Sequence, residues 1–239
     1  GGFGGAPKFP NASIVRFVNH LYRTSGDDFY AAMLTKTLDR MSQGQVLDDH
    51  DGGFFRHCAS ADWSEPQHEK MLEDNLGLAR EFLNAGILME RPKYVETAKQ
   101  TVNYLMEQLF DPAIPGFRGS QGAHSDYFSL APQQRTDSGR PTPDPSCYVN
   151  GNGLAVTVLL EAAWKLGDPH LQTIAIQVLD RLDSMARSGS FTHVYSEHGP
   201  SDVPAFVADW AWLLTALVKA HANTAAEAYL ERAISVAQV

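Results

Sequence analysis

The feature that most constrains this chain is a contrast between consecutive segments with helical periodicity. The segment from Phe206 to Val218 carries a single ionisable group, and the segment from Leu154 to Leu160 carries none. Helices that are apolar around most of their circumference lie buried in the interior. The segments that follow them, near 169–187 and 225–237, are amphipathic instead. This contrast predicts inner helices, each followed by an outer helix that covers it.

Apolar periodicity and cap signals divide the chain into eight expected helices. Ser64 followed by Gln67 resembles a capping box, and Asp168 followed by Pro169 is a cap with a first-turn proline. The expected helices lie near residues 12–25, 28–43, 66–84, 92–110, 152–166, 169–187, 204–222 and 225–237. Consecutive pairs of this kind predict an all-α fold made of antiparallel helical hairpins.

The pairing of inner and outer helices favours an α/α toroid. In a four-helix bundle every helix would be amphipathic, which does not fit the two apolar segments. A superhelical stack of helix pairs shows a similar alternation, so this second architecture stays open. Four hairpins are fewer than the six of the common toroid. We therefore expect one α/α-toroid domain over residues 1–239, with an open or incomplete ring.

Residues 111–149 interrupt the helical pattern with prolines and glycines, including Pro112, Pro141 and Gly139. A long connection without periodicity is usually either a functional lid or a disordered link. The aromatic pair Tyr127-Phe128 near its middle favours a loop that packs down, because a solvated link has little use for such side chains. We expect this loop to lie over the mouth of a ligand cavity.

The charge balance argues against two classes of partner. Nineteen Lys and Arg residues against 28 Asp and Glu give a formal net charge of −9, which disfavours nucleic acid and anionic membrane surfaces. No apolar run approaches the roughly 20 residues that span a bilayer. The chain begins Gly1-Gly2 without Met or a signal peptide, so we expect a processed product or an internal piece of a longer, cytoplasmic protein.

Metal and cofactor motifs are missing from the sequence. The run from Asp48 to Asp51 lacks the alternating ligands and the terminal Glu of an EF-hand. Cys58 and Cys147 match neither a zinc site nor a disulfide framework, which fits two free thiols. No phosphate loop, nucleophile elbow or dinucleotide fingerprint occurs. We expect no metal and no cofactor.

The densest set of polar side chains lies just before and within the third expected helix. We expect His68 and Glu69 at the mouth of that helix, where they would serve as general acid and base. Arg56 or Lys70 would then hold a carboxylate or a sugar hydroxyl. The other interpretation is that all four are ordinary first-turn residues and surface ion pairs.

Asp209 is a second candidate because it stands alone in the most apolar helix of the chain. An ionised carboxylate in such a place needs hydrogen bonds or a cation, or else its pKa rises. Its position near the helix start also suits a capping carboxylate with no catalytic role. Trp210 beside it is either a core residue or part of the aromatic wall of a sugar cavity.

Several motifs occur in order along most of the chain. They are Gly1-Gly2-Phe3-Gly4-Gly5-Ala6-Pro7-Lys8-Phe9-Pro10, Gly52-Gly53-Phe54 with Arg56, Trp63, Pro66 with Glu69-Lys70-Met71-Leu72 and Asp74-Asn75, and Asn152-Gly153-Leu154. Together they resemble the YyaL-type, thioredoxin-fused family, which includes a spermatogenesis-associated protein. The resemblance implies a thioredoxin-like domain followed by an α/α toroid similar to six-hairpin glycosidases and N-acylglucosamine 2-epimerases. This chain would be the toroid portion, without the upstream thioredoxin-like domain.

Three positions depart from the pattern of that family. Gln67 stands where the family has His after the proline, which on a helix moves His68 by about 100°. The segment 122–124 replaces an Asp-Ala-Asp of the family, and Gly151 replaces a Trp. These changes imply either altered chemistry or a cavity that has become a binding or assembly surface.

We expect His68, Glu69 and Asp209 to be catalytic. The expected ligand-binding residues are Arg56, Trp63, Lys70, Asp74, Asn75, Tyr127, Asn152 and Trp210. The expected function is binding or processing of a small polar, sugar-like ligand, by acid–base isomerisation or epimerisation or by glycosidase-like chemistry. The alternative is a non-catalytic scaffold or a subunit of a larger assembly, with a thioredoxin-like module or a partner subunit completing the ring.

Overall fold

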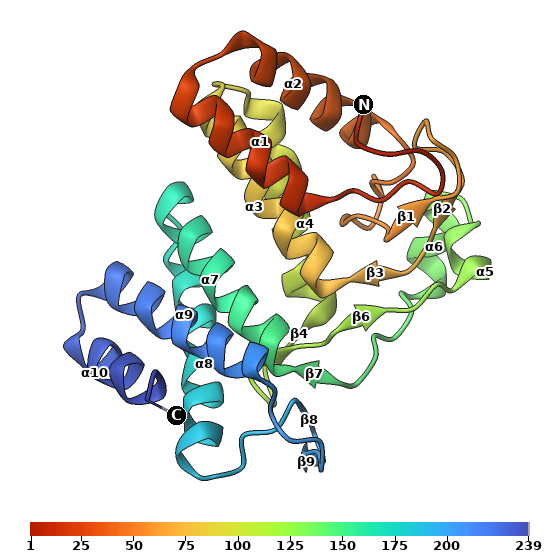
Figure 1. Cartoon of the computed structure of the whole chain (residues 1–239). Helices are drawn as coiled ribbons and strands as arrows, with labels where there is room; N and C mark the ends of the chain where they lie inside the picture. Colours follow the sequence, from red (N-terminus) through yellow and green to blue (C-terminus); the bar gives the residue numbers. More distant parts are fainter. Residues whose placement is uncertain (239) are drawn as a thin grey trace. The chain divides into compact units, whose positions relative to one another are not determined.

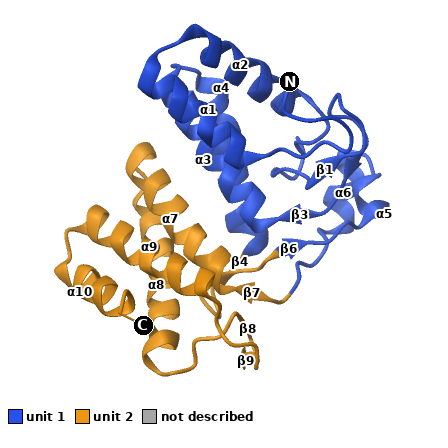
Figure 2. Ribbon diagram, in the orientation of Figure 1, with its two compact units in different colours: residues 1–109, 120–144 blue, residues 110–119, 145–239 orange. Residues whose placement is uncertain are grey.

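The computed structural model describes residues 1–238 and shows a mainly helical chain with a few short strands (Figure 1). The chain divides into two compact units (Figure 2). Unit 1 comprises residues 1–109 and 120–144, and unit 2 comprises residues 110–119 and those from 145 onward. None of the described helices is both long and apolar enough to cross a membrane.

Unit 1 is built around two helical hairpins, α1–α2 and α3–α4. Its helices are α1 (Ala12–Ser25), α2 (Asp28–Gln43), α3 (Leu72–Leu88), α4 (Pro92–Tyr104) with its π-helical continuation η1 (Leu105–Leu109), α5 (Ser125–Phe128) and α6 (Pro132–Ser138). Gly26 ends α1 with a left-handed backbone, and the Asp27 carboxylate begins α2 by accepting the Phe29 N–H at 2.8 Å. The inner helix α3 packs on α4, with Leu76 and Phe82 fully buried.

Short strands join distant segments of unit 1. β1 (His57–Cys58) pairs with β2 (Pro66–Gln67), and β3 (Lys70–Met71) pairs with β6 (Ser120–Gln121), in both cases antiparallel. The second pairing holds the start of the 120–144 segment beside the residues that lead into α3.

Unit 2 also consists of helical hairpins with small strands at their ends. Its helices are α7 (Val149–Leu166), α8 (Pro169–Arg187), α9 (Val207–Thr224) and α10 (Glu227–Val236). Its strands are β4 (Phe110–Asp111), β5 (Gly116–Phe117), β7 (Cys147–Tyr148), β8 (Val194–Ser196) and β9 (Gly199–Pro200). β4 and β5 form one hairpin, and β7, β8 and β9 form an antiparallel sheet in that order. The predicted cap of α8 is confirmed, because Asp168 accepts the His170 N–H at 2.9 Å.

The third helix begins at Leu72, six residues later than expected, so the predicted start is wrong. Ser64 does not cap a helix, since its N–H and hydroxyl both bind the Asp62 carboxylate, at 3.1 and 2.6 Å. The residues that follow pair as strands β2 and β3. His68 and Glu69 therefore lie on an extended segment ahead of the helix, and the helical spacing inferred for them does not apply.

The prediction that α9 is buried on all sides is also wrong. Its buried face carries Leu213 and Leu217, and the helix packs on α7, α8 and α10. Val207 and Val218 remain 85% and 48% exposed. The apolar pattern shows which side chains could be buried. Whether they are buried also depends on how much surface the neighbouring helices cover.

The long connection over residues 111–149 packs down, as expected. Tyr127 and Phe128 are 8% and 4% exposed and contact Phe55 in one buried cluster. The connection is not structureless, however, because it contains α5, α6, β5 and β6. Short hydrogen-bonded elements are consistent with a segment that docks on the rest of the chain.

Candidate functional site

A pocket of about 480 Å³ opens in unit 1, between the end of α2 and the α5–α6 segment. Its size lies within the range of small-molecule sites. Its wall includes Gln45, Asp48, Asp49, His68, Phe128 and Arg135. The wall thus combines an imidazole, carboxylates and an amide with an aromatic face.

His68 is the predicted catalytic residue that the structure places in this pocket. Its ring stacks on that of Phe128, with 5.1 Å between centroids and 26° between planes, and meets Phe55 edge-on at 4.9 Å. Burial lowers the pKa of His68, the guanidinium of Arg135 lowers it further, and the Asp48 carboxylate opposes them in part. A neutral imidazole is the form that accepts a proton.

Lys70 is fully buried and is occupied by protein groups. Its ammonium lies 2.8 Å from Asp48 Oδ2 and donates to the Gly52 carbonyl at 2.7 Å. Three aromatic rings face the same ammonium at 4.6 to 5.2 Å, those of Phe55, Tyr104 and Phe128. Burial alone would raise the pKa of Asp48, but Lys70 and Arg135 hold that pKa below its ordinary value. Lys70 was expected to bind ligand, but its ammonium pairs with Asp48 instead.

Arg135 connects the loop to the same carboxylate. Its Nη1 lies 3.0 Å from Asp48 Oδ1, and its other nitrogens donate to the carbonyls of Phe128 at 2.6 Å and Leu130 at 3.2 Å. The guanidinium also lies 5.4 Å from the Phe128 ring centroid. Arg135 therefore fixes the α5–α6 segment to the wall of the pocket.

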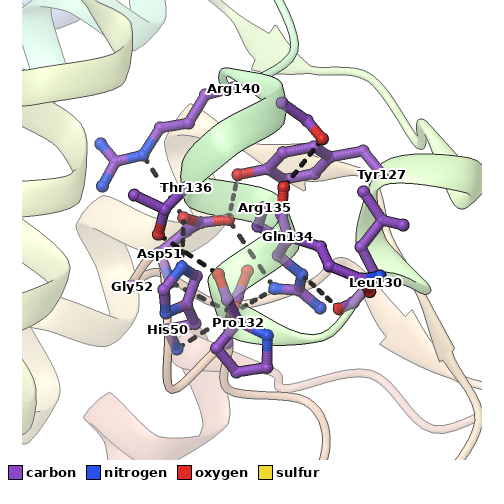
Figure 3. Close-up of polar contacts among 12 residues, drawn as sticks. His50, Asp51, Gly52, Tyr127, Leu130, Pro132, Gln134, Arg135, Thr136 and Arg140 are labelled. Carbon is purple, nitrogen blue, oxygen red and sulfur yellow. Dashed lines mark hydrogen bonds and ion pairs between the residues drawn. The ribbon is translucent and has the colours of Figure 1, made fainter.

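Asp51 extends this network, as Figure 3 shows. Arg140 Nε lies 3.3 Å from Asp51 Oδ1, and Arg140 Nη1 lies 2.9 Å from Glu107 Oε2. The Tyr127 hydroxyl donates to Asp51 Oδ2 at 2.9 Å, and burial together with this carboxylate raises the pKa of Tyr127 to about 12. Cations and carboxylates alternate along the network, in the order Lys70, Asp48, Arg135, Asp51, Arg140 and Glu107.

Arg56 and Glu69 form a surface pair, with Arg56 Nη1 2.6 Å from Glu69 Oε2. Their side chains are 49% and 32% exposed, and neither lines the pocket. Asp74, on the first turn of α3, also lies outside the pocket wall. Burial raises the pKa of Asp74, and Arg56 opposes this. Arg56, Glu69 and Asp74 were expected to work with His68, but they do not line the pocket in which it lies.

Asn75 and Asn152, both expected to bind ligand, are fully buried and bind backbone instead. Asn75 Oδ1 accepts the Phe54 N–H at 2.6 Å, and its Nδ2 donates to the Phe54 carbonyl at 3.0 Å. Asn152 makes the same two bonds to Phe117, at 2.6 and 2.9 Å. Each amide holds the hairpin that precedes its helix.

The two predicted tryptophan contacts are packing residues in their units. Trp63 is 1% exposed, and the Lys8 ammonium lies 5.0 Å from its ring centroid. Trp210 is half-buried against Phe191, with 4.3 Å between ring centroids. Asp209 is fully buried at the first turn of α9 and caps it by accepting the Phe206 N–H at 2.7 Å.

Sequence reasoning missed the roles of Asp48, Asp51, Arg135 and Arg140. Asp48 and Asp51 drew attention only as possible metal ligands, and within residues 1–238 no group of three or more His, Cys, Asp or Glu is placed to hold a metal ion. A usable signal was present, because the acidic run 48–51 and the basic residues of the long connection have opposite charges.

Comparison with known proteins gives related sequences in several animals. The chain is 33% identical to spermatogenesis-associated protein 20 of Homo sapiens over 129 residues, which are 52% of this chain and 16% of that protein. It is 32% identical to the uncharacterized protein B0495.5 of Caenorhabditis elegans over 131 residues, 18% of that protein. The matched part thus spans less than a fifth of either relative. No protein-family model matches the chain.

Solved structures match nearly the whole chain. A D-mannose isomerase aligns with 99% of this chain and 63% of its own, at a TM-score of 0.74 and 12% identity. A family 76 glycoside hydrolase from a bovine Bacteroides thetaiotaomicron strain covers 94% of this chain and 45% of its own, at 0.66 and 17%. The cellobiose 2-epimerase of Spirochaeta thermophila covers 100% of this chain and 77% of its own, at 0.61 and 13%.

These similarities confirm both the resemblance and the fold class inferred from the sequence. TM-scores of 0.61 to 0.74 establish a shared fold, whereas sequence identities of 12 to 17% leave the reaction open. About half of this chain is similar in sequence to a part of spermatogenesis-associated protein 20, and the chain has the α/α-toroid fold that is also found in a sugar isomerase, a sugar epimerase and a family 76 glycoside hydrolase.

Proposed function

We propose that unit 1 binds an uncharged sugar in the His68 pocket and that His68 transfers a proton during isomerisation or epimerisation of that sugar. The observation that carries the proposal is the environment of His68. Its imidazole lines a pocket of ligand size, rests on an aromatic wall, and has a lowered pKa that favours the neutral form.

The pocket wall favours an uncharged ligand. Arg135 is engaged by Asp48 and two carbonyls, and Lys70 by Asp48 and Gly52, so neither cation needs a ligand anion. Asp49 adds a second carboxylate to the wall. The ring of Phe128 offers an apolar face, and nearby amides and hydroxyls suit sugar hydroxyl groups. A sugar phosphate would find both cations already engaged by Asp48 and would be repelled by Asp49.

The solved structures with this fold include a D-mannose isomerase and a cellobiose 2-epimerase, which makes aldoses the first substrates to test. His68 would take the proton from the carbon next to the carbonyl of the open-chain sugar. The electrons of that C–H bond would form an enediol, with a proton added to the carbonyl oxygen. Return of a proton to C1, with loss of the O2 proton to solvent, would give the ketose. Return of a proton to the other face of C2, with loss of the O1 proton to solvent, would give the epimer.

Glycoside hydrolysis fits the pocket less well. It requires two carboxyl groups that flank the scissile bond, one of them able to act as an acid. Asp48 lies on the wall but is held ionised by Lys70 and Arg135, with its pKa below the ordinary value. Asp49 alone does not make the required pair.

Exchange of the C2 proton with solvent tests the proposal. The full chain is incubated with D-mannose, D-glucose or cellobiose in deuterated water, and loss of the C2–H signal is followed by proton NMR. We expect exchange by the unmodified chain and a rate at least about 100-fold lower for His68→Asn. Arg56→Ala is the matched control and should exchange at the unmodified rate. Equal exchange by His68→Asn, or no exchange with any of the sugars, would refute the proposal.

An assembly role is a second candidate, supported by apolar side chains left exposed in unit 2. Val207 is 85% exposed, Trp164 is 77% exposed and Ile234 is 55% exposed. Exposed apolar surface is typical of protein contacts when the side chains form one patch. Light scattering of the chain and of a Val207→Glu, Trp164→Glu double variant tests this role. A mass above the monomer that the variant loses would support it, and a monomer in both would refute self-assembly.

A further inference from the structure

Unit 2 contains a carboxylate–imidazole pair that is separate from the His68 pocket. The Asp209 carboxylate is fully buried and accepts backbone N–H groups of Asn150 at 3.0 Å and Phe206 at 2.7 Å. Both of its oxygens also lie 3.0 Å from His193 Nδ1. The cap of α9 accounts for the bond from Phe206, and the first turn of α7 accounts for the bond from Asn150. Neither helix start accounts for the imidazole.

The position of Asp209 determines how His193 presents its other nitrogen. A buried carboxylate at Nδ1 favours the tautomer that carries the proton there, which leaves a lone pair on Nε2. The His193 side chain is 22% exposed. Among residues 1–238, no hydrogen bond to Nε2 is found. The pair therefore offers an oriented acceptor to a molecule that arrives from solvent.

Two exposed aromatic rings flank this imidazole. The Phe206 ring lies 4.7 Å from the His193 ring, centroid to centroid, and the Tyr148 ring lies 5.5 Å from it. Phe206 is 53% exposed and Tyr148 is 37% exposed. Aromatic faces left open to water beside a fixed polar group are typical of surfaces that hold ligands with one apolar and one polar side.

We propose that His193, Tyr148 and Phe206 form a carbohydrate-contact surface of unit 2, oriented by Asp209. The two rings would pack on the C–H face of a sugar, and His193 Nε2 would accept a hydrogen bond from a sugar hydroxyl. The chemistry favours an uncharged ligand, because the buried carboxylate of Asp209 is already bound by two backbone N–H groups and by His193. The proposal does not rest on the function proposed for the His68 pocket.

The experiment separates this surface from the pocket by working in the His68→Asn variant of the full chain. Cellobiose and D-mannose are the probes, and binding is followed by saturation-transfer NMR. We expect saturable binding in His68→Asn, with the strongest transfer to sugar C–H protons. Adding Phe206→Ala should weaken it at least tenfold, and adding His193→Ala should do the same.

The controls distinguish ligand contact from loss of structure. Phe206→Ala keeps the backbone N–H that Asp209 accepts, so its circular dichroism and melting temperature should remain those of the parent variant. Trp164→Ala, at another exposed aromatic residue of unit 2, should leave binding unchanged. The proposal would be overturned by no binding in His68→Asn, by unchanged binding in Phe206→Ala, or by tighter binding of adenosine than of either sugar.

Discussion

The hairpin before α3 in unit 1 and the hairpin before α7 in unit 2 have the same backbone pairing and are held in the same way. Leu47 bridges Phe54 in the first, and Phe110 pairs with Phe117 in the second. In both, an asparagine of the next helix clamps the phenylalanine through its N–H and its carbonyl. The chain thus repeats one local structure in two units.

The acidic residue of the turn is repeated as well. Asp48 Oδ1 accepts the His50 N–H at 3.2 Å, and Asp111 Oδ1 accepts the Ala113 N–H at 2.9 Å. In both hairpins the aspartate lies six residues before the clamped phenylalanine. Such side-chain bonds to the backbone two residues on are typical of turns.

The two units differ at a buried position five residues before the clamping asparagine, in the strand that leads into the helix. Lys70 occupies it in unit 1 and Cys147 occupies it in unit 2. Lys70 binds the turn aspartate and begins the ion network that holds the loop over the pocket. In unit 2 the turn aspartate pairs instead with Arg118, at 2.7 Å and partly exposed. The two hairpins thus share their backbone pairing. The residue at this buried position determines whether an ion network forms beside the hairpin.

The largest effect should come from replacing the buried cation. Lys70→Met leaves Asp48 buried with Arg135 as its remaining cationic partner, and we expect a loss of about 3–5 kcal/mol in the free energy of unfolding of unit 1. Cys147→Ala, at the equivalent position, removes no charge and should cost less than about 2 kcal/mol. Urea unfolding of both variants measures the difference. Equal losses would show that Lys70 acts only by filling space.

The next effect tests the asparagine–phenylalanine hydrogen bonds that the two units share. Asn75→Ala and Asn152→Ala each leave the N–H and the carbonyl of a phenylalanine without a partner. We expect each to lose about 2–4 kcal/mol in the free energy of unfolding. The two losses should agree within about 1 kcal/mol, as measured by urea unfolding. A loss confined to one variant would end the equivalence of the two hairpins.

Acid should affect unit 1 through Asp48. The folded-state pKa of Asp48 lies below its ordinary value near 4. Ionised Asp48 therefore stabilises the fold above that value, and the contribution is lost as the pH falls through the folded-state pKa. The difference in the free energy of unfolding between the unmodified chain and Asp48→Asn should shrink as the pH falls from about 5 to about 2.5. A difference that stays constant would contradict the ion-pair assignment.

The smallest effect is expected at the surface pair of unit 1. Arg56→Ala removes an exposed partner of Glu69 and should cost less than about 1 kcal/mol. It should also leave sugar binding unchanged, because neither residue lines the His68 pocket. Calorimetric titration with D-mannose and urea unfolding measure both quantities. A large loss of binding would restore the catalytic role first expected for Glu69.

Local signals in the sequence predicted those helix boundaries that depend on neighbouring residues. Gly26 with Asp27 and Asp168 with Pro169 mark helix boundaries because the cap and the group it binds lie within a few positions. The inner and outer alternation favoured the toroid class and left a superhelical stack of helix pairs as the other architecture.

Long-range pairings explain what the sequence did not predict. α3 begins late because Lys70 and Met71 pair with a strand near residue 120, which no local pattern indicates. The same holds for the pocket, where Arg135 meets Asp48 across 87 residues of sequence. Such contacts depend on the docked loop, and charge complementarity was the only trace they left in the sequence.

The most direct test of the pocket in unit 1 is the NMR signal of the His68 Cε1 proton, followed while D-mannose is added to the full chain. We predict a saturable shift of this signal, retained in Arg56→Ala, because the imidazole lies in the wall of the pocket. A signal that does not move while the sugar binds, or a chain that binds no sugar at all, would contradict the placement of the site at His68.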